Sequence, residues 1–407
     1  MTTILVSAGD ASGEAHAAEL VRAMRERRPD LRFVGMGGPR MAAAGVEIVV
    51  EQSELAVGGF IEILPSLGRL WSAWRRMLTC ARSARPAAIV LVDSGGFHLP
   101  FARQVRRRVA APILYFVAPQ AWAWRPHRAR KIAARADRIA VILPFEAAFY
   151  AKRGIEVDFV GHPLLDRVAS APDGSAAAAG RAAAAPLSSP GHVGAERERA
   201  RARLGIAPYV PVLAIFPGSR RNELARNLPV QLEAFARLRE AQPGLQGIVG
   251  LAESLDLASA KAIVGRGPRE LGGALRIVRG ESETLGWAAD VALAKPGTIT
   301  VELMLRGCPM VVMGRVHPWS ARLARLWVDL PWLAMPNLIA GETIVPELMQ
   351  EAARPDRIVA ALAPLFEEPA RQRQIEALAR ASQRLGAPGA VDRTAAILEE
   401  MLDTAGA

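Results

Sequence analysis

The chain has 407 residues, which is enough for two domains that each bury a substantial core. Hydrophobic residues make up 51% and charged residues 22%, so the composition is globular and excludes a disordered chain. The net charge of +11 suits an anionic substrate or an anionic membrane surface. Nucleic-acid binding is not predicted, because the sequence carries no zinc-ligand spacing and no aromatic stacking signature.

Three further features bear on where the protein acts. Cys80 and Cys308 lie in apolar segments and are too few for a disulfide framework, so we expect both to be reduced in a cytoplasmic protein. The chain opens directly on a predicted strand, which argues against a signal peptide. The nearest approach to a membrane span, 110–124, is interrupted by Pro112 and Pro119. We therefore expect a soluble or peripherally membrane-bound protein.

Short apolar runs alternate with amphipathic helical segments, which is typical of parallel sheets built from βαβ units. The expected strands are 3–7, 32–35, 88–92, 113–117, 138–142 and 158–160 in the first half, and 212–216, 247–250, 275–278, 291–294 and 310–313 in the second. Residues 171–200 are rich in Ala, Gly, Pro and Ser, so we assign 167–200 to a flexible linker or insertion. The pattern predicts an α/β protein with two Rossmann-like domains, 1–166 and 201–384, facing across a cleft. The last helices, about 385–407, are expected to pack back on the first domain.

The loop after the first strand, 8–14, carries Ser12 and Gly13, and His16 follows just inside the next helix. Ser12 is a good helix N-cap and Glu14 suits the positive end of a helix, which explains these residue types by structure alone. Gly9 and Gly13 also allow a ligand to approach the backbone. We therefore place Ser12, Gly13 and His16 at a candidate acceptor site.

The segment 61–78 mixes large apolar side chains with arginine. Five apolar residues fall on one helical face: Leu67, Leu70, Trp71, Trp74 and Leu78. A core-facing helix is the ordinary explanation of such a face. The alternative is a membrane-contact helix, because Trp together with Arg is typical of an interface with lipid.

Asp93 directly follows the apolar run 88–92, so it lies at the carboxyl end of a predicted strand. Gly95 and Gly96 follow it and leave it uncrowded. A carboxylate in this position can take a proton from an attacking hydroxyl group. An Asx-turn or an N-cap for the next helix is the alternative, and position alone does not choose between them.

The segment Trp122-Ala123-Trp124-Arg125 places aromatic and cationic groups together. Trp124 and Arg125 can contact a sugar and a phosphate, while core packing is an equal alternative for the two tryptophans.

Two strand-turn-helix elbows stand in the second half, at 212–220 and 291–302. The free N–H groups of a helix N-terminus bind anions, and a carboxylate one turn inside the helix can accept hydrogen bonds from a sugar. Either elbow alone is common in doubly wound proteins, but the pair indicates a bound diphosphate. The residues that carry this prediction are Gly218, Ser219, Arg220, Lys295, Gly297, Thr298 and Glu302.

Taken together, these segments resemble the lipid-A-disaccharide synthase family, which is glycosyltransferase family 19. The Trp-Ala-Trp-Arg segment at 122–125 and the Pro-Asn-Leu segment at 336–338 are specific to that family. The other matching segments run in order along nearly the whole chain: 8–13, 33–41, 143–146, 159–163, 217–220, 297–298 and 307–312.

The resemblance implies a GT-B fold and an inverting glycosyl transfer. The donor is UDP-2,3-diacylglucosamine, the acceptor is 2,3-diacylglucosamine 1-phosphate (lipid X), and the products are the β-1,6-linked disaccharide 1-phosphate and UDP. Asp93 matches the family's proposed base, and the segment around 67–78 matches its membrane-facing patch. The residues that match the UDP side are Ser219, Arg220, Gly297, Thr298, Glu302 and Asn337. No metal or other cofactor is expected, the location is the cytoplasmic surface of the inner membrane, and a homodimer through the C-terminal helices is left open.

Three departures from the family pattern accompany the resemblance. The family usually has Pro-Asp-Phe-Asn where this chain has Gly95-Gly96-Phe97-His98, so the acceptor contacts near Asp93 differ. Lys295-Pro296 replaces a typical Ala-Ser and brings a cation to the second elbow. Asp10 and Glu14 stand where Glu and Asp are more common. Another UDP-GlcNAc-dependent GT-B transferase, an epimerase, and a non-catalytic relative that binds lipid or nucleotide are the alternatives.

Overall fold

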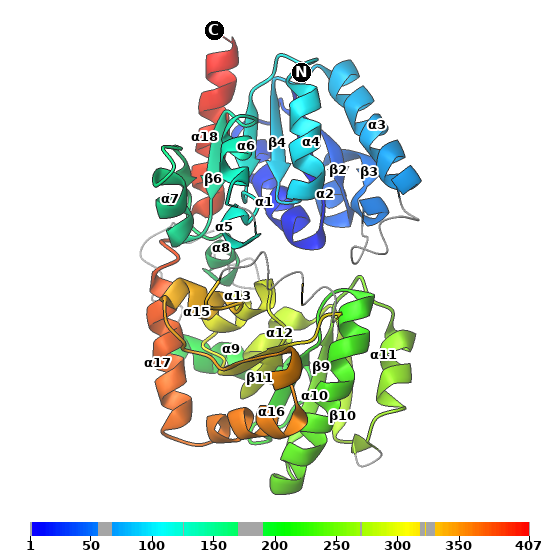
Figure 1. The fold of residues 1–407 in the computed structure, drawn as a ribbon, viewed down its shortest axis with the longest axis vertical. Helices are drawn as coiled ribbons and strands as arrows, with labels where there is room; N and C mark the ends of the chain where they lie inside the picture. Colours follow the sequence, from blue (N-terminus) through cyan, green and yellow to red (C-terminus); the bar gives the residue numbers. More distant parts are fainter. Residues whose placement is uncertain are drawn as a thin grey trace. The chain divides into compact units, whose positions relative to one another are not determined.

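The structure is a computed structural model that describes residues 2–55, 67–124, 126–169, 190–268, 271–317, 322 and 330–406. It divides into two compact units. The first contains Met1–Arg167 and Leu385–Ala407, and the second contains Val168–Arg384. Each unit is built on a parallel sheet with helices on both faces, so the prediction of two Rossmann-like α/β domains is confirmed (Figure 1). Within the described ranges, no helix is both long enough and apolar enough to cross a bilayer.

The sheet of the first unit has seven parallel strands in the order β3-β2-β1-β4-β5-β6-β7. Their bounds are β1 (Thr3–Ala8), β2 (Arg32–Gly37), β3 (Val46–Glu51), β4 (Ala88–Val92), β5 (Ile113–Phe116), β6 (Arg138–Val141) and β7 (Asp158–Phe159). The central strands are continuous apolar runs because both faces of the sheet are covered. The sequence did not predict β3, an edge strand interrupted by Glu47 and Glu51.

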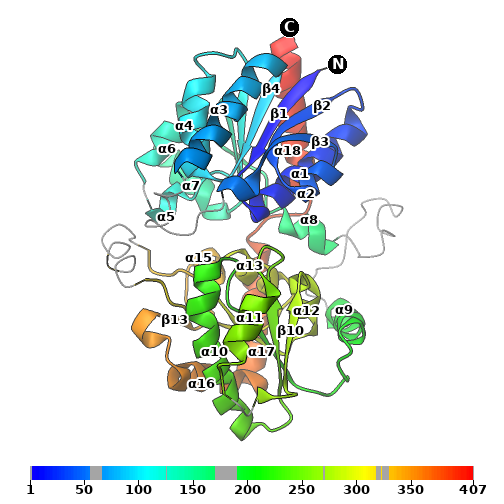
Figure 2. The same cartoon turned by 90° about the vertical axis from the view of Figure 1, so that its right-hand side faces the viewer.

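Helices cover both faces of this sheet (Figure 2). One face carries α1 (Ala11–Arg27), α2 (Pro39–Ala43) and α18 (Ala390–Gly406), and the other carries α3 (Leu67–Ala84), α4 (Gly95–Val105) and α6 (Arg128–Ala133). The remaining elements are η1 (Gln52–Leu55), α5 (Ala121–Trp124), α7 (Pro144–Ala151) and α8 (Leu164–Ala169). Helix α18 packs on α1, as predicted for the end of the chain.

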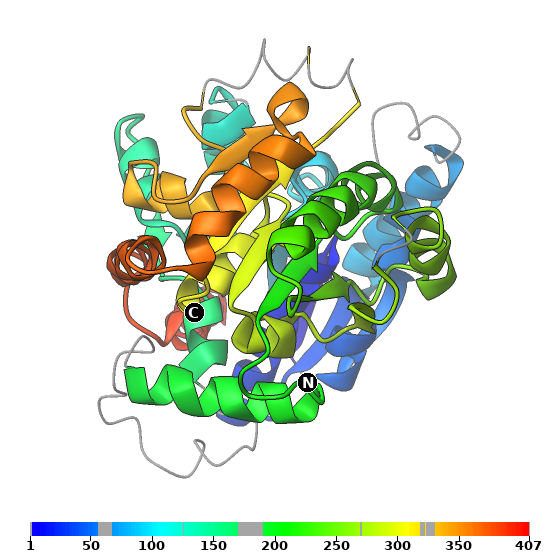
Figure 3. The same cartoon turned by 90° about the horizontal axis from the view of Figure 1, so that it is seen from below.

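The sheet of the second unit has six parallel strands in the order β10-β9-β8-β11-β12-β13. They are β8 (Val212–Phe216), β9 (Gln246–Leu251), β10 (Leu275–Arg279), β11 (Val291–Ala294), β12 (Met310–Gly314) and β13 (Glu347–Met349). The short edge strand β13 was not predicted. Figure 3 shows the second unit from below. The helices of this unit are α9 (Pro190–Arg203), α10 (Arg221–Ala241), α11 (Leu257–Val264), α12 (Ser282–Ala288), α13 (Thr298–Leu305), α15 (Met335–Ala340), α16 (Pro355–Leu362) and α17 (Ala370–Gln383). Two 3-10 turns, η5 (Gln350–Ala352) and η6 (Ala363–Phe366), also belong to it.

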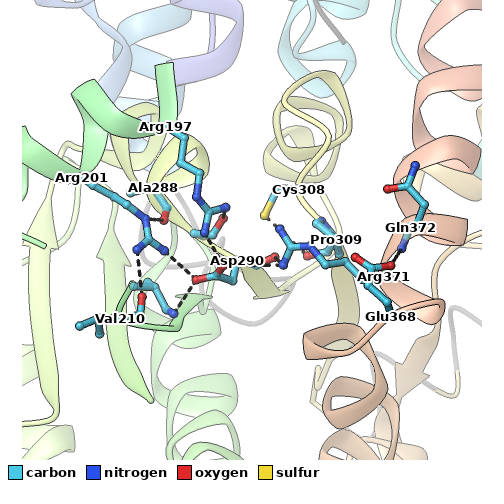
Figure 4. A network of polar contacts seen from close by, with 12 residues as sticks. Arg197, Arg201, Val210, Ala288, Asp290, Cys308, Pro309, Glu368, Arg371 and Gln372 are labelled. Carbon is cyan, nitrogen blue, oxygen red and sulfur yellow. Dashed lines mark hydrogen bonds and ion pairs between the residues drawn. The ribbon is translucent and has the colours of Figure 1, made fainter. Parts of the chain in front are cut away.

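Helix α9 corrects part of the linker prediction, because residues 190–200 are helical. Asp290, at the amino end of β11, holds this helix to the sheet (Figure 4). Its Oδ2 atom accepts hydrogen bonds from Arg201 at 2.7 Å and from the Val212 amide at 2.8 Å, and Arg197 pairs with Oδ1. The Ala, Glu and Arg residues of this segment are good helix formers, and the ion pairs with Asp290 join the helix to the sheet. Residues 170–189 of the predicted linker lie outside the described residues.

Candidate functional site

Asp10 and Asp93 form a carboxyl pair at one edge of the first sheet. They follow the neighbouring strands β1 and β4, whose register pairs Ala8 with Val92, so both lie at the carboxyl ends of parallel strands. Asp10 lies close enough to Asp93 for its charge to disfavour ionisation of the Asp93 carboxyl group, because two neighbouring carboxylates repel each other when both are ionised.

The surroundings of Asp93 favour its protonated form. Asp93 is half-buried as a whole residue. Enough protein surrounds the carboxyl that loss of hydration, together with the nearby charge of Asp10, raises the pKa of Asp93 above its ordinary value. A carboxylate with a raised pKa is a better proton acceptor than an exposed one once it is ionised.

The backbone at Asp93 is in an unusual conformation. Asp93 has φ +51° and Ser94 has φ +46°, both in the left-handed region. The N-cap of α4 is Ser94, so capping by Asp93, the alternative that the sequence left open, is not observed. The Asp93 carbonyl accepts hydrogen bonds from the Tyr115 hydroxyl at 2.8 Å and from His98 Nδ1 at 2.9 Å.

The structure revises the roles of the first loop. The N-cap of α1 is Asp10, whose Oδ1 accepts from the Gly13 amide at 2.7 Å, and Ser12 lies inside the first turn. His16 is only 3% exposed and contacts the rings of Phe116 and His162. Ser12 and Gly13 therefore adjoin the carboxyl pair, whereas His16 lies beneath the surface.

The tryptophan segment lies beside a buried carboxyl group. Trp122 Nε1 donates to Glu146 Oε1 at 3.1 Å, and its ring packs edge-on against Phe145. Burial raises the pKa of Glu146 to about 7, although the amides of Ile142 and Leu143 also bond its carboxyl. Trp122 is thus engaged in packing, while the Trp124 side chain and all of Arg125 lie outside the described residues.

The residues of the predicted membrane face on α3 differ in their exposure. Trp74 and Leu78 are half-buried and pack against the core of the first unit, which is the ordinary explanation of an apolar helix face. Trp71 is 58% exposed, with the Arg75 guanidinium 4.6 Å from its ring, and it opens onto a groove of about 680 Å³. Leu70 is half-buried, and the side chain of Leu67 lies outside the described residues. The groove is also lined by Arg32, Arg76, Val34, Val49, Thr79 and Cys80.

In the second unit, the two elbows meet at one carboxylate that the sequence did not single out. Strands β8 and β11 pair Phe216 with Ala294, which brings the two turns together. Glu223, in the first turn of α10, accepts from the Ser219 amide at 3.0 Å and lies 3.0 Å from Lys295 Nζ and 3.6 Å from Arg220 Nη1. A carboxylate three residues into a predicted helix is a capping pattern, which was the available signal.

The turn at Gly218 needs glycine. Its φ is +122°, and a Cβ there would collide with the Glu223 side chain. At the second elbow Gly297 is the N-cap of α13, and Thr298 is exposed at its first position. Both turns thus leave backbone and cationic groups at the carboxyl edge of the sheet, an arrangement that can bind an anion.

Glu302 and Asn337 are both engaged within the protein. Glu302 is half-buried and lies 3.7 Å from Arg306, which also pairs with Glu283. Asn337 is fully buried, and its amide makes four hydrogen bonds: two donated, to Val345 and Glu347, and two accepted, from the amides of Ile344 and Val345. With its hydrogen-bonding capacity filled, Asn337 positions Glu347 and the 341–347 loop instead of contacting a ligand directly.

Comparisons with known proteins match the same family over nearly the full chain. The family model described as lipid-A-disaccharide synthetase matches residues 4–182 and 186–401. The lipid-A-disaccharide synthase of Geobacter metallireducens is 36% identical over 402 residues, covering 98% of this chain and 97% of that protein. The enzyme of the same name from Myxococcus xanthus is 36% identical over 401 residues, with 98% and 97% covered.

Solved structures that resemble this chain share its fold at low sequence identity. The UDP-GlcNAc 2-epimerase of Neisseria meningitidis, bound to UDP-GlcNAc, has a TM-score of 0.65 at 11% identity and covers 98% of this chain and 100% of its own. The calicheamicin glycosyltransferase CalG4 has a TM-score of 0.57 at 17% identity, with 99% and 98% covered. The architecture is therefore that of GT-B glycosyltransferases and UDP-GlcNAc epimerases, and the chain belongs to the lipid-A-disaccharide synthase family.

Proposed function

We propose that this chain is a lipid-A-disaccharide synthase in which Asp93 is the catalytic base. The reaction transfers 2,3-diacylglucosamine from UDP-2,3-diacylglucosamine to the 6-hydroxyl of 2,3-diacylglucosamine 1-phosphate. The observation that carries the role of Asp93 is its position beside Asp10 at the carboxyl edge of the first sheet. Open α/β sheets place their ligands beyond this edge.

The chemistry follows from these groups. The acceptor hydroxyl gives its proton to Asp93 while its oxygen attacks the anomeric carbon from the side opposite the diphosphate. The bond between that carbon and the diphosphate oxygen breaks, UDP leaves with the bonding electrons, and the anomeric configuration inverts. A half-buried carboxylate beside Asp10 suits this proton transfer because its pKa is raised.

We assign the donor to the second unit, where negative charge grows on the leaving diphosphate. Lys295 and Arg220 lie at the two elbows and share Glu223, so two cations are close to the amides at the start of α10 and α13. Cations and helix N-termini stabilise a developing anion. We assign the diphosphate to the two turns, which contain Gly218, Ser219, Gly297 and Thr298. In this proposal Glu302 faces the sugar hydroxyls.

We assign membrane contact to α3, at the cytoplasmic surface of the inner membrane. Trp71 and Arg75 form an exposed aromatic and cationic pair, and a groove lined by further arginines adjoins it. Such a mixture favours the boundary between lipid headgroups and acyl chains.

A turnover assay with purified protein and both acylated substrates in mixed micelles tests the function. Wild-type protein should form the tetraacyl disaccharide 1-phosphate and UDP, and Asp93→Asn should lose at least about a hundredfold in rate, the lower end of general-base catalysis. Asp137→Asn is a matched control, because Asp137 lies at the opposite edge of the same sheet, where it pairs with Arg106. Disaccharide formation by Asp93→Asn at the wild-type rate would contradict the role of Asp93.

A further inference from the structure

The catalytic role proposed for Asp93 depends on a backbone conformation that non-glycine residues seldom adopt. Asp93 and Ser94 are consecutive residues with positive φ, +51° and +46°. An L-residue in the left-handed region is disfavoured because its Cβ approaches the following carbonyl oxygen. Two in succession persist only where surrounding contacts hold them.

Two side chains supply those contacts by donating to the same carbonyl. The backbone carbonyl oxygen of Asp93 lies 2.8 Å from the Tyr115 hydroxyl and 2.9 Å from His98 Nδ1. Tyr115 and His98 are both completely buried, so neither bond competes with water. The backbone contacts of the Asp93 amide are longer: it lies 3.2 Å from the Val117 oxygen and 3.3 Å from the Phe116 oxygen.

The contacts of His98 fix its protonation and its tautomer. A carbonyl oxygen only accepts hydrogen bonds, so Nδ1 of His98 must carry a proton and donate it. The Nε2 atom lies 2.8 Å from Ser7 Oγ and accepts from that hydroxyl when the ring is neutral. Burial lowers the pKa of His98 to about 4, which keeps the ring neutral near physiological pH.

The glycine at the start of α4 allows His98 to reach the Asp93 carbonyl. A Cβ on Gly95 would stand 2.8 Å from Pro119, so glycine permits the close approach of α4 to the loop after β5. His98 then lies one turn into α4 and under the carboxyl end of β1, where Ser7 is available. The Gly95-Gly96-Phe97-His98 sequence therefore lets α4 pack closely and brings His98 into contact with the Asp93 carbonyl.

We propose that His98, as the neutral Nδ1–H tautomer oriented by Ser7, is a positioning residue that holds the Asp93 backbone in its left-handed conformation and so aims the carboxylate. This inference rests on the proposed function of Asp93. His98 never contacts substrate; it acts through the Asp93 carbonyl, with Tyr115 as the second donor.

Three variants of the full-length protein test the proposal through kcat and KM in the micelle assay. His98→Leu removes both hydrogen bonds and should lower kcat roughly tenfold or more, because a misplaced base loses much of its rate, while KM for the UDP-sugar stays unchanged. His98→Asn places an amide donor near the position of Nδ1 and should restore most of kcat. Val105→Ala, a core substitution on the same helix, controls for lost stability and should retain wild-type kcat while folded.

NMR of the histidine rings distinguishes a positioning role of His98 from a merely structural one. The activity of Asp93→Asn shows separately whether the proposed function of Asp93 has failed. Nitrogen NMR of the isotope-labelled histidine rings should show His98 as the Nδ1–H tautomer at neutral pH, and Ser7→Ala should keep this tautomer because the Asp93 carbonyl still requires a donor. Wild-type kcat in folded His98→Leu, or an Nε2–H ring in the wild-type protein, would overturn the proposal. If Asp93→Asn proves fully active, the proposed function fails instead, and the NMR result still decides whether His98 holds the Asp93 carbonyl.

Discussion

The Asp93 side chain, the proposed catalytic base, is expected to reduce the stability of the fold. Its pKa is raised by loss of hydration and by Asp10, so the folded state binds its proton more tightly than the unfolded chain does. Between the unfolded pKa and the raised one, the folded state therefore holds more protons, and stability falls as the pH rises. Above the raised pKa the whole penalty is present.

Asp93→Asn should consequently stabilise the protein while abolishing its activity. The amide has the shape of the carboxyl group but carries no charge beside Asp10. We expect the free energy of unfolding of the first unit to rise by about 1 kcal/mol at about pH 8, and the gain to vanish near about pH 2, where Asp93 is protonated in both states. Thermal unfolding across this pH range measures the effect. A gain of equal size at both ends would show that the charge is not its source.

Buried polar side chains near the sites were the hardest to assign from sequence. Asp93 was found because an acidic residue directly after a buried strand is a local signal. Asn337 was selected by resemblance, but its four internal hydrogen bonds give it a positioning role. Glu223 and Asp10 each show a local capping pattern, but their contacts with Lys295 and Asp93 on other elements have no fixed spacing along the chain.

Among whole elements, the interior strands were predictable and the edges were not. Strands such as β4 and β8 are buried on both faces, so their apolar runs stand out. Strand β3 is an edge strand that carries Glu47 and Glu51, and β13 has only three residues, so neither produces that signal. Helix α9 has few apolar side chains and shows no amphipathic pattern, and its ion pairs join it to Asp290 on another element.

The two elbows of the second unit form one electrostatic element around Glu223. Lys295 pairs with Glu223 at 3.0 Å, so the cation is held ready at the turn while its charge is partly neutralised. A bound diphosphate would compete with Glu223 for Lys295. The two substitutions at this pair should therefore act in opposite directions.

Lys295→Ala should weaken UDP binding by about tenfold, which is 1.4 kcal/mol, and Glu223→Gln should strengthen it by removing a competing negative charge. Glutamine retains an oxygen that accepts from the Ser219 amide, so the turn is preserved. Calorimetric titration with UDP at low and high salt measures both effects. Lys261→Ala, on the exposed surface of α11, is the matched control and should bind as the wild type does. Weaker binding by Glu223→Gln would mean that this carboxylate supports the ligand instead of competing with it.

The first unit is completed by a segment from the far end of the chain. Helix α18 packs on α1, and Asp166 accepts hydrogen bonds from the amides of Gly389, Ala390 and Val391 at the start of α18. Arg27 of α1 pairs with Asp392 and Glu399 of α18. The unit therefore depends on contacts between segments more than 200 residues apart, because Val391 and Asp166 are separated by 225 positions.

Removal of α18 should unfold the first unit and leave the second folded. The helix buries four large apolar side chains: Ile397, Leu398, Met401 and Leu402. At roughly 1.5 to 3 kcal/mol for each, their burial contributes roughly 6 to 12 kcal/mol, which matches the whole stability of a typical domain. A chain ending at residue 384 should therefore lose one of two unfolding transitions in calorimetry and become sensitive to protease within 2–167. Asp166→Asn, which removes only the charge at the start of α18, should cost about 1 kcal/mol and retain both transitions. Two intact transitions in the truncated chain would show that the first unit folds without its C-terminal helix.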